Sequence, residues 1–347
     1  VSEPPPDGGL QQIHSQFSVA EDADAVLLTA PTGRIFRPGK FETPSLAELR
    51  LRAEPYLDIG VALQLEILKP EMGDRFGLSV KELHTRPEAV GAVFQVASQF
   101  NCLEFIDSSD TPEMGVTRYI KDKSQGPACA LACAASTLWR NYFVTVGACA
   151  EKGQTASRQI NNLEDVQQML GEGLLDVHNG YTSSSRLDEL SEKVGRMSEA
   201  ERDQLRGAVR IGVQWDAEVT DQEISKKRID GKWRDVGRTC GAVTQVFCSA
   251  LSLLGSRNAE SPSWQPLAQI VLEAAYEATL AVATINHHRQ VATMEEVPQA
   301  TKDVYLTLLG AGNFGNASSW IHDAIKRALL RYASSGLRAR LVFFGAR

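Results

Sequence analysis

Residues 304–325 read VYLTLLGAGNFGNASSWIHDAI, in which a short apolar segment is followed by three glycines within six residues and then by the start of a helix. The segment from Tyr305 to Leu309 predicts a strand, and glycine lets the backbone that follows adopt positive φ values and approach a ligand closely. A helix that begins near Ser318 directs its unpaired N–H groups and the positive end of its dipole towards the loop. The stretch is therefore typical of a phosphate-binding site, and a tight turn without a ligand is the alternative.

The composition and position of this loop exclude two common phosphate-binding motifs. It has no lysine, which a P-loop needs, and it lies near the end of the chain, whereas the Rossmann fingerprint belongs to the first βα unit. Elsewhere, apolar segments that suit strands alternate with segments that suit helices, which predicts a three-layer α/β domain. Strands are expected within 61–70, 92–105, 208–220, 243–251, 305–309 and 338–346, and helices within 43–52, 126–143, 163–170, 186–208, 264–288 and 319–333.

The length and composition of the chain are those of an ordinary globular protein. Its 347 residues are 43% hydrophobic and 23% charged, which suffices for a full hydrophobic core. A net charge of −7 argues against nucleic acid as a partner, and apolar runs such as ACALACAAS are too short to cross a membrane. The proline-rich residues 1–40 predict an extended, poorly ordered arm, and residues 41–347 predict a single enlarged domain.

Cysteine usage favours a reducing compartment. The six cysteines, at positions 102, 129, 133, 149, 240 and 248, form no Cys-X-X-Cys pair. We therefore expect reduced thiols in the core rather than disulfides or a metal site. The sequence opens with no charged segment followed by an apolar one, and a cytoplasmic location is predicted.

Two stretches together resemble the macrodomain family. Residues 304–325, followed by a helix and a last strand, are similar to the loop that wraps the diphosphate and distal ribose of ADP-ribose in that family. FQVASQFNCLEF (94–105) is similar to the central macrodomain strand, which ends in an asparagine that faces the distal ribose. The resemblance extends over roughly residues 41–347. Within the family, the chain most resembles the enlarged branch that contains the MavL-type ADP-ribosylhydrolases, which act on ADP-ribosylated arginine.

The resemblance implies a macrodomain-like mixed sheet with added helices, and it assigns ligand-binding roles. The first loop of the family, Asn-Ala-Ala-Asn followed by three glycines, is replaced here by Asn-Cys-Leu-Glu, so we place its diphosphate contact at the helix start 124–126. A Gly-Pro helix start without a ligand is the alternative there. Asp74 is the candidate for adenine binding. The predicted ligand-binding residues are Asn101, Ser124, Gln125, Gly126, Gly310, Ala311, Gly312, Asn313, Phe314, Gly315 and Asn316.

The acidic stretch WDAEVTD (215–221) supplies candidate catalytic residues. Cleavage of an N-glycosidic bond develops positive charge on the ribose, and carboxylates stabilise that charge or activate water. Paired carboxylates also suit an arginine guanidinium, which they bind through two parallel hydrogen bonds. Asp216 and Glu218 lie on one face of a strand and Asp221 follows them, so these three are predicted to be catalytic. Solvated acids at the end of a strand are the alternative.

Two functions of different classes follow. A hydrolase would remove mono-ADP-ribose from modified protein side chains, with the arginine linkage favoured by the acids, whereas a reader module would bind ADP-ribose without cleaving it. ADP-ribose and an ADP-ribosylated protein are the expected partners, and no cofactor is expected besides ADP-ribose as substrate or product. A second acidic patch beside Asn101, formed by Glu104, Asp107 and Asp110, is interpreted as a solvated loop.

Overall fold

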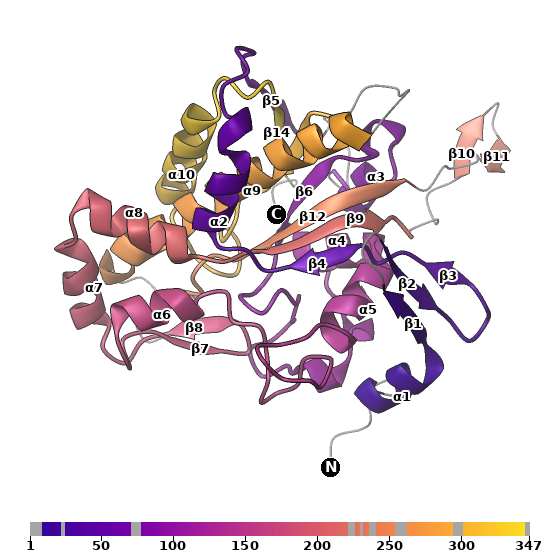
Figure 1. The fold of residues 1–347 in the computed structure, drawn as a ribbon, viewed down its shortest axis with the longest axis horizontal. Helices are drawn as coiled ribbons and strands as arrows, with labels where there is room; N and C mark the ends of the chain where they lie inside the picture. The colour runs from indigo at the N-terminus through magenta and orange to yellow at the C-terminus, as the bar shows by residue number, and fades with distance from the viewer. Residues whose placement is uncertain are drawn as a thin grey trace.

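A seven-stranded mixed sheet forms the centre of the molecule (Figure 1). The structure is a computed structural model that describes residues 9–21, 25–70, 78–220, 226–229, 232–235, 241–253, 262–293 and 301–343. Within this sheet, β9 alone runs against its neighbours, and the other six strands share one direction. In spatial order the strands are β4 (Lys40–Glu42), β9 (Gly212–Glu218), β12 (Ala242–Cys248), β6 (Val93–Ala97), β13 (Asp303–Leu306), β14 (Arg338–Val342) and β5 (Gln64–Leu68).

Helices cover both faces of the sheet. One face packs against α2 (Leu46–Ala53), α9 (Gln265–Thr293) and α10 (Ser318–Arg331), which lie together in Figure 1 and share one apolar core with the sheet. The other face packs against α3 (Val80–His84) and α4 (Gln125–Ala132) through a second core. The predicted three-layer α/β class with a mixed sheet is confirmed.

α9 is the central helix of the larger core. The segment Pro262–Ala292 is long and apolar enough to cross a membrane by length and composition alone, and 83% of its most apolar window is buried inside the protein. A helix that is apolar on all sides belongs either in a membrane or deep in a large core. The sheet, α2 and α10 surround this one, and their contacts account for its composition.

The N-terminal residues differ from the extended arm that the sequence predicts for 1–40. They form α1 (Gly9–Gln16) and a small sheet of β1 (Ser18–Glu21), β2 (Val26–Thr29) and β3 (Ile35–Phe36). Ile13, Val26 and Leu28 are buried against Trp139 and Tyr142 of α5 (Ala134–Tyr142). The prediction of an extended arm is therefore wrong for residues 9–21 and 25–40, because a distant helix provides the apolar surface on which these residues fold.

Two predicted helical segments are divided, and the one expected at 186–208 forms α7 (Leu187–Gly195) and α8 (Glu199–Ala208). The helix expected at 126–143 is split at Cys133, whose φ of −123° and ψ of 63° leave the helical region. A long insertion between α5 and β9 adds a hairpin and three helices. These and the other elements are α6 (Glu164–Leu170), β7 (Asp176–His178), β8 (Tyr181–Ser183), α7 (Leu187–Gly195), α8 (Glu199–Ala208), β10 (Lys226–Ile229), β11 (Lys232–Asp235) and the short 3-10 helices Glu54–Tyr56, Pro87–Ala89, Pro112–Met114, Thr117–Lys121 and Pro262–Trp264.

The strand directions decide which loops can meet. β6 and β12 are parallel, with Cys248 opposite Ala97, and β13 lies on the other side of β6 in the same direction. The loops that follow β6, β12 and β13 therefore leave the sheet at one edge, which we call the carboxyl edge. β9 is antiparallel to β12, with Glu218 opposite Ala242, so the carboxyl end of β9 lies at the opposite edge.

Replacement of Gly126 by alanine should destabilise the fold, because α4 begins in direct contact with the end of β6. A Cβ atom at this position would lie 2.0 Å from the carbonyl oxygen of Ala97. Overpacking of this kind costs about 1–3 kcal/mol. Gly195→Ala is the matched control, since nothing lies within 4 Å of a Cβ atom there. Urea denaturation should show a loss only for Gly126→Ala, and equal midpoints for the two variants would contradict the close contact.

Candidate functional site

The glycine loop, residues 310–316, leaves the end of β13 at the carboxyl edge and leads into α10. Gly310 and Gly315 have φ values of +76° and +69°, in the left-handed region that glycine favours. The N–H groups of Gly315 and Asn316 donate to the carbonyl oxygens of Gly312 and Gly310 at 3.0 and 2.9 Å. The chain therefore folds back on itself, and the loop has a defined shape.

The middle of the glycine loop is open to a ligand. Gly312 and Asn313 are exposed, and a Cβ atom at Gly312 would meet nothing within 4 Å. Among the described residues, no acceptor lies within hydrogen-bonding distance of the N–H groups of Gly312, Asn313 and Phe314. No side chain caps the start of α10, which follows directly. Unpaired N–H groups next to a helix start are the donors that a phosphate needs.

Asn316 joins the glycine loop to the end of β12. Its Nδ2 donates to the carbonyl oxygen of Leu251 at 2.8 Å. Its Oδ1 is buried and has no hydrogen-bond partner among the described residues. A buried acceptor of this kind is typical of a site that a ligand or a water molecule completes.

The hairpin of β7 and β8 brings an aromatic side chain to the glycine loop. The ring of Tyr181 lies 5.7 Å from that of Phe314, with their planes tilted by 58°. Burial, together with the negative charges of Asp107, Asp110 and Asp122, raises the pKa of Tyr181 to about 12. The hydroxyl of Tyr181 donates to the carbonyl oxygen of Phe105 at 3.3 Å, so this side chain lies beside the segment that carries Asp107 and Asp110.

The second acidic patch belongs to an ordered segment, residues 103–110, which we call the acidic loop. Gln99 holds Phe105 from both sides, accepting from its N–H at 2.8 Å and donating to its carbonyl oxygen at 3.1 Å. Asp110 is buried and forms an ion pair with Arg118. Glu104 and Asp110 of this patch are buried and Asp107 is exposed, so the patch is a solvated loop only in part, and the side chain of Gln99 holds its backbone.

Asp107 and Asp122 are the two acids of this group that solvent reaches. Asp107 is exposed, and hydrogen bonds from the hydroxyl and N–H groups of Ser109 lower its pKa, so its carboxylate is charged at neutral pH. Asp122 is half-buried just before α4 and accepts from the N–H group of Ser124 at 2.7 Å. Neither residue was predicted to be catalytic from the sequence. The hairpin that carries Tyr181 could have been predicted, because an Asn179–Gly180 pair is typical of two-residue β-hairpin turns.

The predicted diphosphate contact at 124–126 has a clear structural role. The side-chain amide of Gln125 donates to the carbonyl oxygen of Gln95 and accepts from the N–H group of Ala97, both at 2.7 Å. Gly126 provides the close contact with β6. These residues hold α4 against the sheet, and a phosphate contact at Ser124 and its neighbours stays a prediction.

Asn101 lies at the carboxyl edge but does not face an open surface. Its side chain is fully buried, its Oδ1 accepts from the N–H group of Leu103 at 3.0 Å, and its Nδ2 donates to Gln159 at 2.8 Å. A bond to the distal ribose would require these contacts to break. The observed arrangement makes Asn101 a support for the acidic loop, and its predicted ribose contact stays a prediction.

The acids of β9 are not brought together with the glycine loop. Asp216 and Glu218 lie at the edge opposite the carboxyl edge, because β9 is antiparallel to β12. Asp216 has a φ of +53° and forms a bidentate ion pair with Arg289 at 2.6 and 2.8 Å. Glu218 accepts from the N–H group of Arg37 at 2.7 Å. The structure therefore does not bring these two predicted catalytic residues to the glycine loop, and Asp221 and Asp74 lie outside the described residues.

A buried ion pair lies beneath the acidic loop. Glu104 and Arg140 are both completely buried, with 3.4 Å between their charged atoms. The guanidinium of Arg140 also lies 3.6 Å from the ring centre of Phe247 and donates to the carbonyl oxygen of Cys102 at 3.0 Å. Burial raises the pKa of Glu104 from 4.5 to about 7, although Arg140 opposes the shift.

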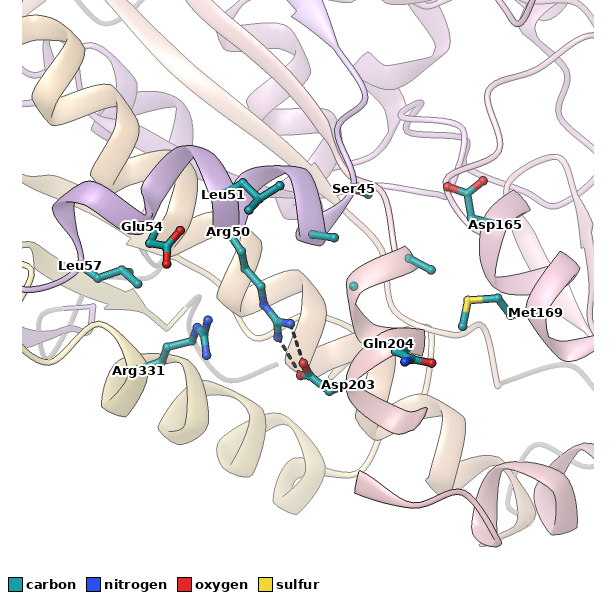
Figure 2. Close-up of a pocket in the computed structure, with 13 residues that line it drawn as sticks. Ser45, Arg50, Leu51, Glu54, Leu57, Asp165, Met169, Asp203, Gln204 and Arg331 are labelled. Carbon is teal, nitrogen blue, oxygen red and sulfur yellow. Dashed lines mark hydrogen bonds and ion pairs between the residues drawn. The ribbon is translucent and has the colours of Figure 1, made fainter. Parts of the chain in front are cut away.

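A separate groove of about 760 Å³ is lined mainly by α2, α6, α8 and α10. Figure 2 shows Arg50 extending across it to Asp203, at 2.9 Å, and the buried Glu277 pairs with both Arg50 and Arg331. These charges satisfy one another and join the helices, and none of the predicted site residues lines the groove. In the part of the chain that the structure describes, no cluster of histidine, cysteine and acidic residues is suited to hold a metal ion.

No known family model matches the chain, and no curated protein matches it in sequence. Among solved structures, it is similar to poly(ADP-ribose) glycohydrolase from Deinococcus radiodurans in complex with ADP-ribose, at 10% identity over 89% of each chain and a TM-score of 0.41. It is also similar to the enzyme of that name from Thermomonospora curvata, at 13% identity over 92% of this chain and 87% of that one, with a TM-score of 0.38. Since the identities and TM-scores are low, the architecture is assigned from the sheet order and helical layers themselves.

The raised pKa of Glu104 should make stability depend on pH. The folded protein holds this proton more tightly than the unfolded chain, so its contribution to stability is present below pH 4.5 and is lost as the pH rises through about 7. Glu104→Gln cannot ionise, and its unfolding free energy relative to wild type should rise by about 3 kcal/mol over that interval. Urea denaturation of both proteins at a series of pH values measures this, and a constant difference would contradict the assignment.

Proposed function

We propose that this chain binds ADP-ribose at the carboxyl edge and hydrolyses the glycosidic bond that joins it to a modified protein side chain, with arginine as the favoured linkage. The observation that carries the proposal is that Tyr181 contacts both the glycine loop and the acidic loop: its ring lies 5.7 Å from that of Phe314, and its hydroxyl donates to the carbonyl oxygen of Phe105 at 3.3 Å. ADP-ribose needs N–H donors for its diphosphate and a carboxylate near the sugar carbon that reacts, and both must lie within reach of one bound molecule. The macrodomain resemblance of 94–105 and 304–325 supports the same ligand.

The glycine loop and the start of α10 are suited to the diphosphate. The N–H groups of Gly312, Asn313 and Phe314 are available, and the dipole of α10 favours negative charge at its N-terminus. The phosphate oxygens would accept from these backbone groups without a lysine or arginine. The buried Oδ1 of Asn316 supplies an acceptor for a ligand hydroxyl beside them.

Asp107 and Asp122 are suited to the reacting end. One carboxylate would stabilise the positive charge on the ribose and polarise the attacking water, and the other would hold the guanidinium leaving group. Asp110 is committed to Arg118 and to the N–H groups of Ile106 and Asp107, so its role is to shape the loop. A cationic leaving group favours such an acidic site over one built for ester linkages.

A reader module is the second candidate, and one observation favours it. The acids expected to perform catalysis from the end of β9 lie at the opposite edge of the sheet. If Asp107 and Asp122 fail to act on the glycosidic bond, the glycine loop alone would still bind ADP-ribose.

Gly312→Glu should weaken ADP-ribose binding at least tenfold, since it adds bulk and negative charge where the diphosphate would lie. The position is open, so the substitution should leave the fold intact. Gly195→Glu, also at an open position, is the control for added charge. Titration calorimetry with ADP-ribose measures the affinities, and equal affinities for the two variants would exclude the glycine loop.

Asp107→Asn and Asp122→Asn should each lower the release of ADP-ribose from arginine-modified protein by about 10²-fold or more, while changing ADP-ribose affinity little. The free product lacks the arginine that these carboxylates would hold. Asp216→Asn tests the expectation from sequence, and we expect its turnover to stay within about threefold of wild type. Single-turnover assays on arginine-, serine- and glutamate-modified proteins measure these rates. Loss of activity in Asp216→Asn alone would reverse the assignment, and binding without cleavage by the wild type would leave the reader function.

A further inference from the structure

A chain of side-chain amides begins and ends on the acidic loop. The N–H group of Leu103 donates to Asn101 Oδ1 at 3.0 Å, and Asn101 Nδ2 donates to Gln159 Oε1 at 2.8 Å. Gln159 Nε2 then donates to Asn179 Oδ1 at 2.8 Å, and Asn179 Nδ2 donates to the carbonyl oxygen of Ser108 at 3.0 Å. We call Asn101, Gln159 and Asn179 the amide chain.

The amide chain is built to hold its ends at a fixed separation. Every amide donates in the same direction, so each link polarises the next, and no link has its donor and acceptor reversed. Asn101 is fully buried and Asn179 is 6% exposed, whereas Gln159 between them is half-buried. The amide chain links the backbone of residue 103 to that of residue 108 through the segments that contain Gln159 and Asn179. It therefore restrains the acidic loop by contacts from outside the loop.

Asn179 is held in place by the end of β6. It has a φ of +49° and Gly180 one of +75°, as in the two-residue turns that suit β-hairpins. The carbonyl oxygen of Gly180 accepts from the N–H group of Phe100 at 3.1 Å, and a Cβ atom at Gly180 would lie 2.8 Å from the side chain of Asn101. The turn therefore rests directly on the carboxyl edge, and the same hairpin carries Tyr181.

We infer that Asn179 is a positioning residue, which acts through the amide chain to hold Asp107 beside Tyr181 and the glycine loop. Ser108, the residue that Asn179 binds, is the neighbour of Asp107 in the chain. The inference rests on the proposed function, since it assigns a task to the acidic loop in hydrolysis. Asn179 does not need to touch the ligand, because a carboxylate misplaced by about 1 Å already loses about 10²-fold in rate.

Two variants of Asn179 separate the amide from the turn. Asn179→Gly keeps a residue that tolerates positive φ and removes the amide. Asn179→Asp keeps an acceptor for Gln159 but cannot donate to Ser108. Asn161→Asp is the matched control, because Asn161 also donates to a glutamine, Gln167 at 2.6 Å, but does not contact the acidic loop.

Hydrogen exchange of the N–H groups of residues 105–110 measures directly how firmly the acidic loop is held. The measurement does not require the protein to be enzymatically active. The N–H groups of Ile106 and Asp107, which donate to Asp110, should exchange about tenfold faster in both Asn179 variants and unchanged in Asn161→Asp. In the hydrolysis assay, both variants should lose about 10–100-fold in kcat, with ADP-ribose affinity within about threefold of wild type. Gln159→Glu breaks the same chain, so the double variant with Asn179→Gly should lose no more than the larger single loss.

Unchanged exchange over 105–110 in Asn179→Gly would overturn the inference, whatever the activity. A parallel loss of ADP-ribose affinity and kcat would also overturn it, since that is the signature of general structural damage. If the wild type cleaves no linkage, the proposed hydrolysis fails and the role in catalysis fails with it, while faster exchange in the variants would still show that the amide chain holds the loop.

Discussion

The shared direction of β6, β12 and β13 is the constraint on which the candidate site depends. Parallel neighbours deliver their following loops to the same edge of a sheet, and here those loops are the acidic loop, the segment after Cys248 and the glycine loop. Asn316, at the end of the glycine loop, can reach the carbonyl oxygen of Leu251 only because β12 and β13 end together. The reversal of β9 has the opposite effect, since it removes Asp216 and Glu218 from the group although they lie on the strand next to β12.

Side-chain amides form many of the hydrogen bonds that stabilise the carboxyl edge. Where strands end, backbone N–H and carbonyl groups lose their ladder partners and must find others. Gln125 supplies both a donor and an acceptor to the backbone of β6, Gln99 does the same for Phe105 of the acidic loop, and Gln95 Oε1 accepts from the N–H group of Thr307 at 3.2 Å. An amide does this without the cost of burying a charge. Charged groups at this edge are either buried and paired, like Glu104 with Arg140 and Asp110 with Arg118, or exposed to solvent, like Asp107.

The parts of the structure that local pattern determines could be predicted from the sequence. The strand, glycine loop and α10 lie together within 304–331, so no distant contact is needed to infer them. The position of Asp216 and Glu218 in the fold could not be inferred. The alternation of side chains along a strand shows which face of the sheet a side chain occupies, but not at which edge of the sheet the strand ends. Tyr181 and the order of the acidic loop depend on contacts between segments far apart in sequence. The fold of residues 9–21 and 25–40 likewise depends on the distant helix α5.

The distribution of charge at the carboxyl edge implies a direction for the proposed ligand. Residues 310–321 contain no lysine or arginine, so the positive potential there comes from backbone N–H groups and the helix start. The two arginines near the acidic loop are already committed, Arg118 to Asp110 and the buried Arg140 to Glu104. The exposed carboxylate of Asp107 keeps its negative charge, which an anionic diphosphate would avoid and a guanidinium would favour. A ligand with a diphosphate at one end and a cationic group at the other would then bind in one orientation, with its glycosidic bond between the glycine loop and Asp107.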